Sequence, residues 1–398
     1  MAEVVARRVR FPDMGRFLFV VPPLMGHVNP TVSVGSELLS RGHQVAWAAH
    51  PQPVAPLLPP GAMLLPLDGD AVAPLFDKFP IRSRPLQGLV AFKFLWEEFL
   101  LPLARIMLPE VEAALDSFQP QALAIDQQAV AGALVARRRG LPWATLATTS
   151  VSMSDPLAGL PLVRRWQADR LAALEQEVGL PPVENPGISP RLVIVFSTEA
   201  LAGPSDRFPS QVRFVGPSIS HRWDTVPFPW EALQECPRVL VSLGTVNMLF
   251  GSRFFATVME ALGDQPFQVI LVAPPERVGS VPANVLVRPF VPQLALLPHV
   301  SAVVCHGGHN TVCEALANGL PLIVAPIKDD QMIVAQQVVE AGAGVRVRFG
   351  RIGAKDLRDA VLQVMSEPRF REAAGRVQQS FAAAGGSKAA ADLLQELL

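Results

Sequence analysis

The residues best suited to chemistry lie around two adjacent glycines in the second half of the chain. A buried apolar run ends at His306, Gly307-Gly308 follows, and a helix is expected to start near Asn310. Glycines let an anion approach the backbone, and the first turn of a helix offers free N–H groups and the positive end of its dipole. Glu314 falls about one turn into this helix, within reach of a ribose. The pattern predicts a diphosphate site with a ribose clamp, and a turn that serves only packing is the alternative.

One histidine near the N-terminus is placed to act as a general base. His27 lies in the loop that joins an apolar strand, Phe17 to Val21, to a helix opened by Asn29-Pro30. A neutral imidazole there can take the proton of a hydroxyl group as its oxygen attacks a carbon atom. A polar loop residue without a chemical role is the alternative.

Alternating strands and helices are expected to position these residues. The first half begins with the strand over 17–21, a helix that runs to Arg41 and stops at Gly42, and a strand over 43–48. Further strands are expected over 122–126, 143–146 and 192–196, and further helices over 87–108, 129–139 and 164–178. This alternation predicts an α/β protein with an open parallel sheet.

A second series of the same kind follows a segment rich in proline and aromatic residues. That segment, residues 217–237, has no periodicity and is expected to be a linker between two domains. Strands are then expected over 239–243, 268–273, 285–288, 302–305, 322–325 and 345–348, with helices over 253–262, 310–318, 331–340, 354–367 and 387–398. Two doubly wound domains that face each other leave a cleft at the carboxyl ends of their strands, where such sheets bind ligands.

Composition argues against several other classes of protein. Lys+Arg number 34 and Asp+Glu 35, so neither nucleic acid nor an anionic membrane is expected as the main partner. The three cysteines have no metal-ligand spacing and suit a reducing cytoplasm, and residues 1–16 lack the apolar core of a signal peptide. Residues 44–67 carry no charge, but repeated prolines exclude a membrane helix there. We therefore expect a cytoplasmic protein without integral membrane association.

The stretch around the glycine pair resembles the donor signature of the UDP-glycosyltransferase family with the GT-B fold. That family includes plant, animal and bacterial natural-product glycosyltransferases, among them macrolide-type enzymes. The matching segments, in the family's order and spacing, are Phe290-Val291-Pro292-Gln293, the run from His306 to Thr311 with Glu314, and Asp330-Gln331. The resemblance extends to Gly26-His27-Val28-Asn29-Pro30, to Leu39-Ser40-Arg41-Gly42-His43 and to Ser242-Leu243-Gly244-Thr245, and so covers nearly the whole chain.

The resemblance implies an inverting enzyme that moves a hexose from a UDP or dTDP sugar to a hydroxyl group of a small apolar acceptor, such as a natural product. It implies two facing Rossmann-like domains: residues 1–216 would bind the acceptor and residues 238–376 the nucleotide sugar. Residues 377–398 would form a helix that crosses back to the first domain. No cofactor or metal is implied, because the helix start and His306 would take the leaving charge. A metal-binding pair, Asp329-Asp330, is the alternative.

The family also implies a role for each matching donor residue. The implied donor-binding residues are Gly244, Thr245, Phe290, Gln293, His306, Gly308, His309, Asn310, Thr311, Glu314, Asp330 and Gln331. Phe290 would stack on the nucleobase where many members have Trp, and Gln293 would touch the base or ribose. Glu314 would bind the ribose, and Asp330 and Gln331 the sugar hydroxyls.

The diphosphate would be bound by His306, Asn310 and Thr311, with Gly308 giving room. Position 309 would lie near the sugar. It is His here, where plant members have Trp and deoxysugar-using bacterial members often have a small residue, so the sugar stays open.

The resemblance pairs His27 with Asp126, which would hold the tautomer of the base and stabilise its charged form. A helix N-cap before Ala129 is the alternative for Asp126. The acceptor side is less defined. The expected helix over 87–108 is apolar nearly all round, so Phe92, Trp96 and Phe99 could line an acceptor pocket as well as form core. Met153, in a loop rich in glycine and proline, could cover that pocket.

Two rival functions share these features. A sugar-nucleotide 2-epimerase on the same fold would need acids around the anomeric carbon and no acceptor pocket. A nucleotide-sugar-binding subunit without chemistry would need neither His27 nor Asp126. Gly26-His27 together with Asp330-Gln331 favours transfer over the epimerase, and the presence of both His27 and Asp126 argues against the subunit.

Overall fold

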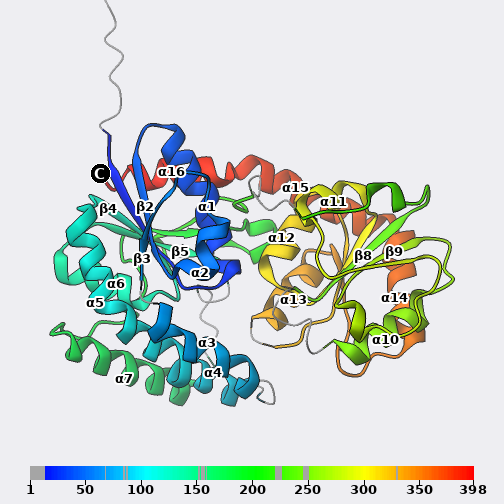
Figure 1. Ribbon diagram of the computed structural model, residues 1–398, viewed down its shortest axis with the longest axis horizontal. Coiled ribbons are helices and arrows are strands. Elements are labelled where there is room, and N and C mark those ends of the chain that lie inside the picture. The colour runs from blue at the N-terminus through cyan, green and yellow to red at the C-terminus, as the bar shows by residue number, and fades with distance from the viewer. Residues whose placement is uncertain are drawn as a thin grey trace, which may run out of the picture.

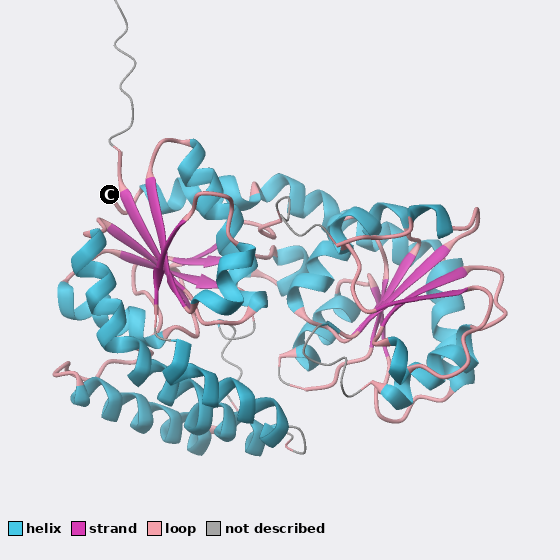
Figure 2. Cartoon of the chain, viewed as in Figure 1, coloured by secondary structure: helices cyan, strands magenta, loops and turns pink. Residues whose placement is uncertain are grey.

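The chain forms two α/β units that lie side by side (Figures 1 and 2). The structure is a computed structural model of the chain, and it describes residues 14–67, 69–83, 86, 88–150, 153, 157, 159–219, 226–244, 251–328 and 330–398. Each unit contains one parallel sheet with helices on both faces. The expected architecture of two doubly wound domains is confirmed.

The first sheet has the strand order β3-β2-β1-β4-β5-β6-β7. Its strands are β1 (Arg16–Val20), β2 (Gln44–Ala49), β3 (Met63–Pro66), β4 (Ala122–Asp126), β5 (Trp143–Ala147), β6 (Val193–Val195) and β7 (Val212–Phe214). β1 pairs in parallel with both β2 and β4, with Phe17 opposite Val45 and Ala122. The strand order reverses between β1 and β4, so the loops after these two strands open side by side at the edge where such folds bind ligands.

The helices of the first unit cover both faces of this sheet. They are α1 (Met25–Ser40), α2 (Pro51–Val54), α3 (Gly69–Ser83), α4 (Gly88–Leu95), α5 (Leu101–Phe118), α6 (Val130–Arg139), α7 (Pro161–Glu177) and α8 (Glu199–Ala202). A π-helical turn, Trp96–Leu100, joins α4 to α5, so the expected helix over 87–108 is longer and interrupted. Pro102 accounts for the interruption, because it has no N–H to donate to the carbonyl four residues earlier.

The second sheet repeats the arrangement in the order β10-β9-β8-β11-β12-β13. Its strands are β8 (Arg238–Ser242), β9 (Gln268–Val272), β10 (Val285–Arg288), β11 (Ala302–Cys305), β12 (Leu322–Val324) and β13 (Gly344–Arg346). The covering helices include α10 (Ser252–Leu262), α11 (Gln293–Leu296), α12 (His309–Ala317), α13 (Gln331–Glu340) and α14 (Ala354–Ser366). The order reverses between β8 and β11, and α12 and α13 face the first unit (Figure 1).

Two further helices end the chain, and each belongs to a different core. α15 (Pro368–Ala384) buries Val377 and Phe381 in the core of the second unit, whereas α16 (Gly386–Gln395) buries Leu394 in the core of the first. α16 packs on α1 (Figure 1), and Arg41 after α1 donates to Gln395 at 2.5 Å. The chain crosses at Gly385, whose φ of 89° favours glycine. The expected domain limit at 376/377 therefore falls inside α15.

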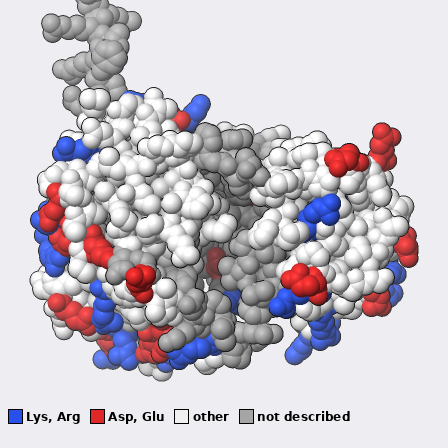
Figure 3. Space-filling model, in the orientation of Figure 1, with Lys and Arg blue, Asp and Glu red and all other residues white. Residues whose placement is uncertain are grey.

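On the face of the molecule that Figure 3 shows, charged side chains are scattered over both units. Figure 3 shows Lys and Arg mixed with Asp and Glu on the visible face, with no large area of one sign, and a hollow between the two units. Among the residues that the structure describes, no helix combines the length and apolar character that crossing a membrane requires.

Candidate active site

The predicted base and its acidic partner lie together at the carboxyl edge of the first sheet. His27 stands in the first turn of α1, after β1, and Asp126 is the last residue of the neighbouring strand β4. His27 Nδ1 is 2.9 Å from both carboxylate oxygens of Asp126, whose side chain is fully buried. The carboxylate requires the proton on Nδ1, so the hydrogen bond assigns the lone pair to Nε2. His27 therefore has the tautomer of a base.

Two further groups fix this pair. The Gln128 backbone N–H donates to Asp126 Oδ1 at 2.8 Å, and Thr148 Oγ1, just beyond β5, lies 3.0 Å from His27 Nδ1. The helix after Asp126 starts at Val130 with Ala129 as its N-cap residue, so Asp126 does not cap it. Sequence reasoning missed Thr148, although a threonine at the end of a neighbouring strand is a signal that could have identified it.

The surroundings of His27 raise the pKa of its imidazole above 6.5. Burial lowers this pKa, but the charge of Asp126 and its hydrogen bond outweigh burial, and the charge of Asp330 adds to the rise. Asp330 belongs to the second unit and precedes α13. The predicted sugar-binding acid thus acts electrostatically on the predicted base across the space between the domains.

The start of α12 forms the second half of the site. β11 ends at Cys305, His306 follows, and Gly308 is the N-cap residue of α12. Glycine has no side chain to pair with the free N–H groups of the first turn, where Asn310 and Thr311 lie. This helix start therefore offers unpaired donors and a positive dipole end to an anion.

Two glycines hold the His306 ring between them. A Cβ atom at Gly244 would lie 2.7 Å from ring atom Cε1, and one at Gly308 would lie 2.4 Å from Nε2. Burial lowers the pKa of His306 to about 4, although a hydrogen bond to the Ser242 backbone opposes the shift. The imidazole is therefore neutral at pH 7, so His306 would meet a leaving charge with a hydrogen bond and not with a positive charge.

The predicted nucleoside contacts lie on the same edge of the second sheet. Phe290, after β10, has 54% of its surface exposed, so one face of its ring is open to stacking. Gln293 opens α11, and its Nε2 donates to Glu314 Oε2 at 2.5 Å. The buried carboxylate of Glu314 is thereby oriented from one side.

The predicted sugar contacts lie at the start of α13. Gln331 Oε1 accepts hydrogen bonds from the backbone N–H groups of Ile327 and Lys328, at 2.9 and 3.2 Å. Its oxygen thus orders the preceding loop, which leaves its amide N–H groups for a ligand. Thr245 and Asp329 lie outside the described residues.

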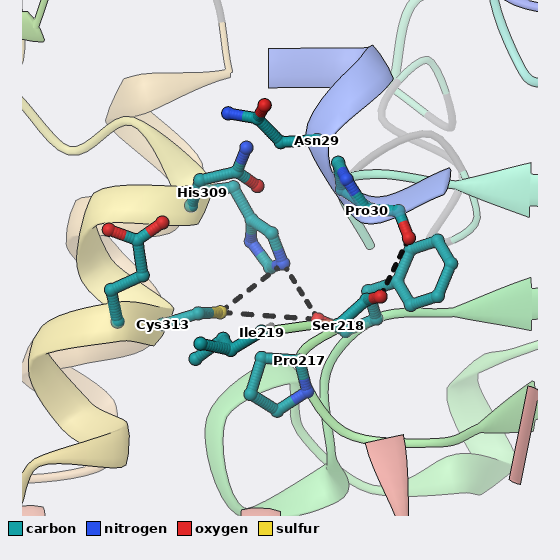
Figure 4. A pocket seen from close by; sticks show the side chains of 10 residues that line it. Asn29, Pro30, Pro217, Ser218, Ile219, His309 and Cys313 are labelled. Atoms are coloured by element: carbon teal, nitrogen blue, oxygen red, sulfur yellow. Dashed lines mark hydrogen bonds between the residues drawn. The ribbon is translucent and has the colours of Figure 1, made fainter. Parts of the chain in front are cut away.

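A small pocket lies between the two domains beside α12 (Figure 4). It is lined by Asn29, Pro30, Phe196, Pro217, Ser218, Ile219, His309, Asn310, Cys313 and Glu314. His309 Nε2 lies 3.1 Å from the Phe196 carbonyl oxygen and 3.4 Å from Cys313 Sγ. His309 is buried and bonded to the first domain, so its side chain belongs to the interface between the domains. Its expected contact with the sugar stays a prediction.

The residues expected to bind the acceptor divide into two groups. Phe99 is 1% exposed and packs on Phe79 at 4.7 Å between ring centroids, and Met153 is buried beside β6. Both are core residues here, because neighbouring apolar side chains enclose them on all sides. Phe92 and Trp96 are only half-buried, and the ring of Phe92 contacts those of Trp96 and Trp166.

Comparison with known proteins identifies the family. A family model described as "Erythromycin biosynthesis protein CIII-like, C-terminal domain" matches residues 256–397. The 4'-demethylrebeccamycin synthase of Lentzea aerocolonigenes is 31% identical over 420 residues, which cover 96% of this chain and 99% of that protein. This chain belongs to the glycosyltransferases with the GT-B fold. It is therefore a glycosyltransferase of the natural-product type.

Other relatives agree with this assignment. The NDP-glycosyltransferase YjiC of Bacillus subtilis (strain 168) is 28% identical, with 93% of this chain and 94% of the relative covered. The crystal structure of CalG4, the calicheamicin glycosyltransferase, superposes with a TM-score of 0.76 at 25% identity and covers 97% of this chain and 98% of its own. The GT-B fold of this glycosyltransferase thus extends over both domains.

Proposed function

We propose that this glycosyltransferase moves a hexose from UDP or dTDP to a hydroxyl group of a small apolar acceptor, with inversion at the anomeric carbon and without a metal or cofactor. The observation that carries the proposal is the hydrogen-bonded pair of His27 and Asp126 on one domain, opposite the uncapped start of α12 on the other. Asn310 of the second domain donates to the carbonyl of Gly26, directly before His27, at 2.9 Å, which supports one site formed by both halves.

The chemistry is a single displacement. His27 Nε2 takes the proton of the acceptor hydroxyl while its oxygen forms a bond to the anomeric carbon. The bond from that carbon to the diphosphate oxygen breaks, and the leaving group takes the electron pair. The first turn of α12 stabilises this charge with N–H groups and the helix dipole.

The contacts of Asp126 support the proposal of inversion. Both of its oxygens lie 2.9 Å from His27 Nδ1, and Oδ1 also accepts the Gln128 N–H. A carboxylate that is buried and bonded in this way is not presented to a sugar as a nucleophile. One displacement without a covalent sugar–enzyme intermediate inverts the configuration.

The choice of donor and acceptor rests on weaker support. The structure of the spinosyn rhamnosyltransferase SpnG was determined with thymidine diphosphate, and the curated relative YojK of Bacillus subtilis (strain 168) is named a UDP-glucosyltransferase. Both nucleotides therefore stay in the proposal. The half-buried rings of Phe92 and Trp96 support an apolar acceptor.

A mass-spectrometric screen of an acceptor library against several UDP and dTDP sugars tests this function. We expect a product heavier than the acceptor by one hexose residue, with an anomeric configuration opposite to that of the donor by NMR. Interconversion of the nucleotide sugar at C2 without an acceptor would support the epimerase instead. Nucleotide binding with neither transfer to an acceptor nor hydrolysis of the donor would support a subunit without chemistry.

A further inference from the structure

One hydrogen bond joins the donor half of the site to the loop of the base. The side-chain amide Nδ2 of Asn310 donates to the carbonyl oxygen of Gly26 at 2.9 Å. Gly26 directly precedes His27, and Asn310 lies in the first turn of α12. The bond therefore crosses between the two domains beside the residue that we propose as the base.

Pro30 explains why the Gly26 carbonyl needs a donor from outside its helix. In an α-helix the N–H of residue 30 would pair with the carbonyl of residue 26. Pro30 lies inside α1 and has no N–H, so α1 cannot supply this bond. Asn310 supplies a donor from the other domain. The same turn of α1 is also held by Ser218, whose hydroxyl donates to the Pro30 carbonyl at 2.7 Å (Figure 4).

Asn310 thus takes part in two structures at once. Its backbone is in the helix turn that faces the diphosphate in the proposed function, while its side chain is engaged with the backbone beside His27. Other described bonds between the domains, such as Gln337 Nε2 to Ser150 Oγ at 3.1 Å, do not involve the loop of the base. The Asn310 bond is therefore suited to fix the separation between base and leaving group.

We propose that Asn310 is a positioning residue, an inference that rests on the proposed function. Its side chain holds the His27 loop against the start of α12 through the Gly26 carbonyl. A displacement reaction needs the base, the attacking oxygen and the leaving group in one line, and small misplacements lower the rate steeply. Base and leaving-group site stand on different domains, so a bond between them controls this alignment.

The variant Asn310→Ala separates positioning from binding. We expect the single-turnover transfer rate, with donor and acceptor saturating, to fall about five- to tenfold, which corresponds to the loss of one neutral hydrogen bond. The Asn310 amide is engaged by Gly26, so any contact of this residue with the diphosphate would run through the backbone N–H groups of α12, which remain in the variant. Nucleotide affinity by calorimetry should therefore stay within about threefold. Asn318→Ala is the matched control: Asn318 ends the same helix, and its amide donates to the Glu314 carbonyl at 2.9 Å within one domain. Its transfer rate should not change.

A second variant tests the mechanism from the other side. Pro30→Ala gives α1 an N–H for the Gly26 carbonyl, so the bond from Asn310 matters less. In that background Asn310→Ala should cost only about twofold in transfer rate, while the calorimetric stoichiometry reports the folded fraction. Equal losses in both backgrounds would overturn the proposal, as would a nucleotide affinity that falls as much as the rate, or a rate that does not fall. If the unaltered enzyme transfers no sugar at all, the proposed function fails instead.

Discussion

Replacing Asp126 by Asn tests the base most directly, because the new amide has no arrangement that pairs every polar group while His27 keeps its proton on Nδ1. Asp126 accepts from His27 Nδ1 and from the Gln128 N–H. An Asn has one oxygen and one NH2 group. An amide oxygen at the Oδ1 position accepts from both neighbours, but the NH2 group then stands at the Oδ2 position, 2.9 Å from His27 Nδ1. If Nδ1 keeps its proton, this buried NH2 group is left unpaired at a cost of about 1–3 kcal/mol. If His27 moves its proton to Nε2, Nδ1 accepts from the NH2 group, but His27 ceases to be a base.

That cost corresponds to a population of the active tautomer reduced roughly 5- to 150-fold, since 1.36 kcal/mol is a factor of ten. We expect Asp126→Asn to lower single-turnover transfer by about this factor, and His27→Ala to lower it by about two to four orders of magnitude. Nucleotide affinity should stay the same in both variants.

The pH profile gives a second measurement of the same pair. The active form of His27 is neutral, so the rate rises as pH passes upward through its pKa, which lies above 6.5. Asp126→Asn removes the largest of the interactions that raise this pKa and leaves the effect of burial, so the midpoint should move to lower pH. Glu177→Gln, an exposed partner of Arg105, removes a carboxylate elsewhere and should not move it. An Asp126→Asn enzyme with full rate and an unchanged midpoint would refute the assignment of the base.

The donor site yields the remaining predictions. Glu314→Ala should weaken nucleotide binding by about 1–3 kcal/mol in calorimetry, because a charged acceptor already oriented by Gln293 is lost; unchanged affinity for both UDP and dTDP would remove Glu314 from the ribose contact. Phe290→Ala should raise the Michaelis constant of the donor and not that of the acceptor. The reverse pattern would mean that the nucleobase of the donor binds elsewhere. Gly308→Ala should weaken nucleotide binding, because the added Cβ would lie 2.4 Å from His306 Nε2 and displace its ring; equal affinity would show that the ring position is irrelevant. Turnover should survive EDTA, and a loss that magnesium reverses would contradict the metal-free mechanism.

Hydrophobic pattern predicted the architecture well, because most strands of both sheets are continuous apolar runs between loops. The strands that it missed, β3 and β7, are short, lie at the two edges of the first sheet and are only partly buried. Helix α3 was not predicted because Pro74 and Pro80 lie inside it, and proline normally argues against a helix. α15 could have been found, since Pro368 at its start and buried residues such as Val377 and Phe381 follow helical rules.

The resemblance to the family implied the pairing of His27 with Asp126. The structure brings them together because His27 follows β1 and Asp126 ends the neighbouring strand β4. It could not predict that His309 bonds to Phe196 or that Asn310 bonds to Gly26, since these partners come from the other domain. Nor could it separate Phe99, which is core, from Phe92, which is half-buried on the preceding helix. An apolar helix alone does not show which neighbours cover each face.

The position of α16 has a consequence for the synthesis of the chain. The first sheet is complete at Phe214, but its core also contains Leu394 and Leu397 from the end of the chain. At about 5–20 residues per second, a ribosome needs roughly 10 to 40 seconds to pass from the one to the other. During that interval the nascent first domain leaves an apolar surface of α1 uncovered, at the place where α16 later packs. Maturation of the first domain thus waits until α16 has been synthesised, long after its sheet is complete.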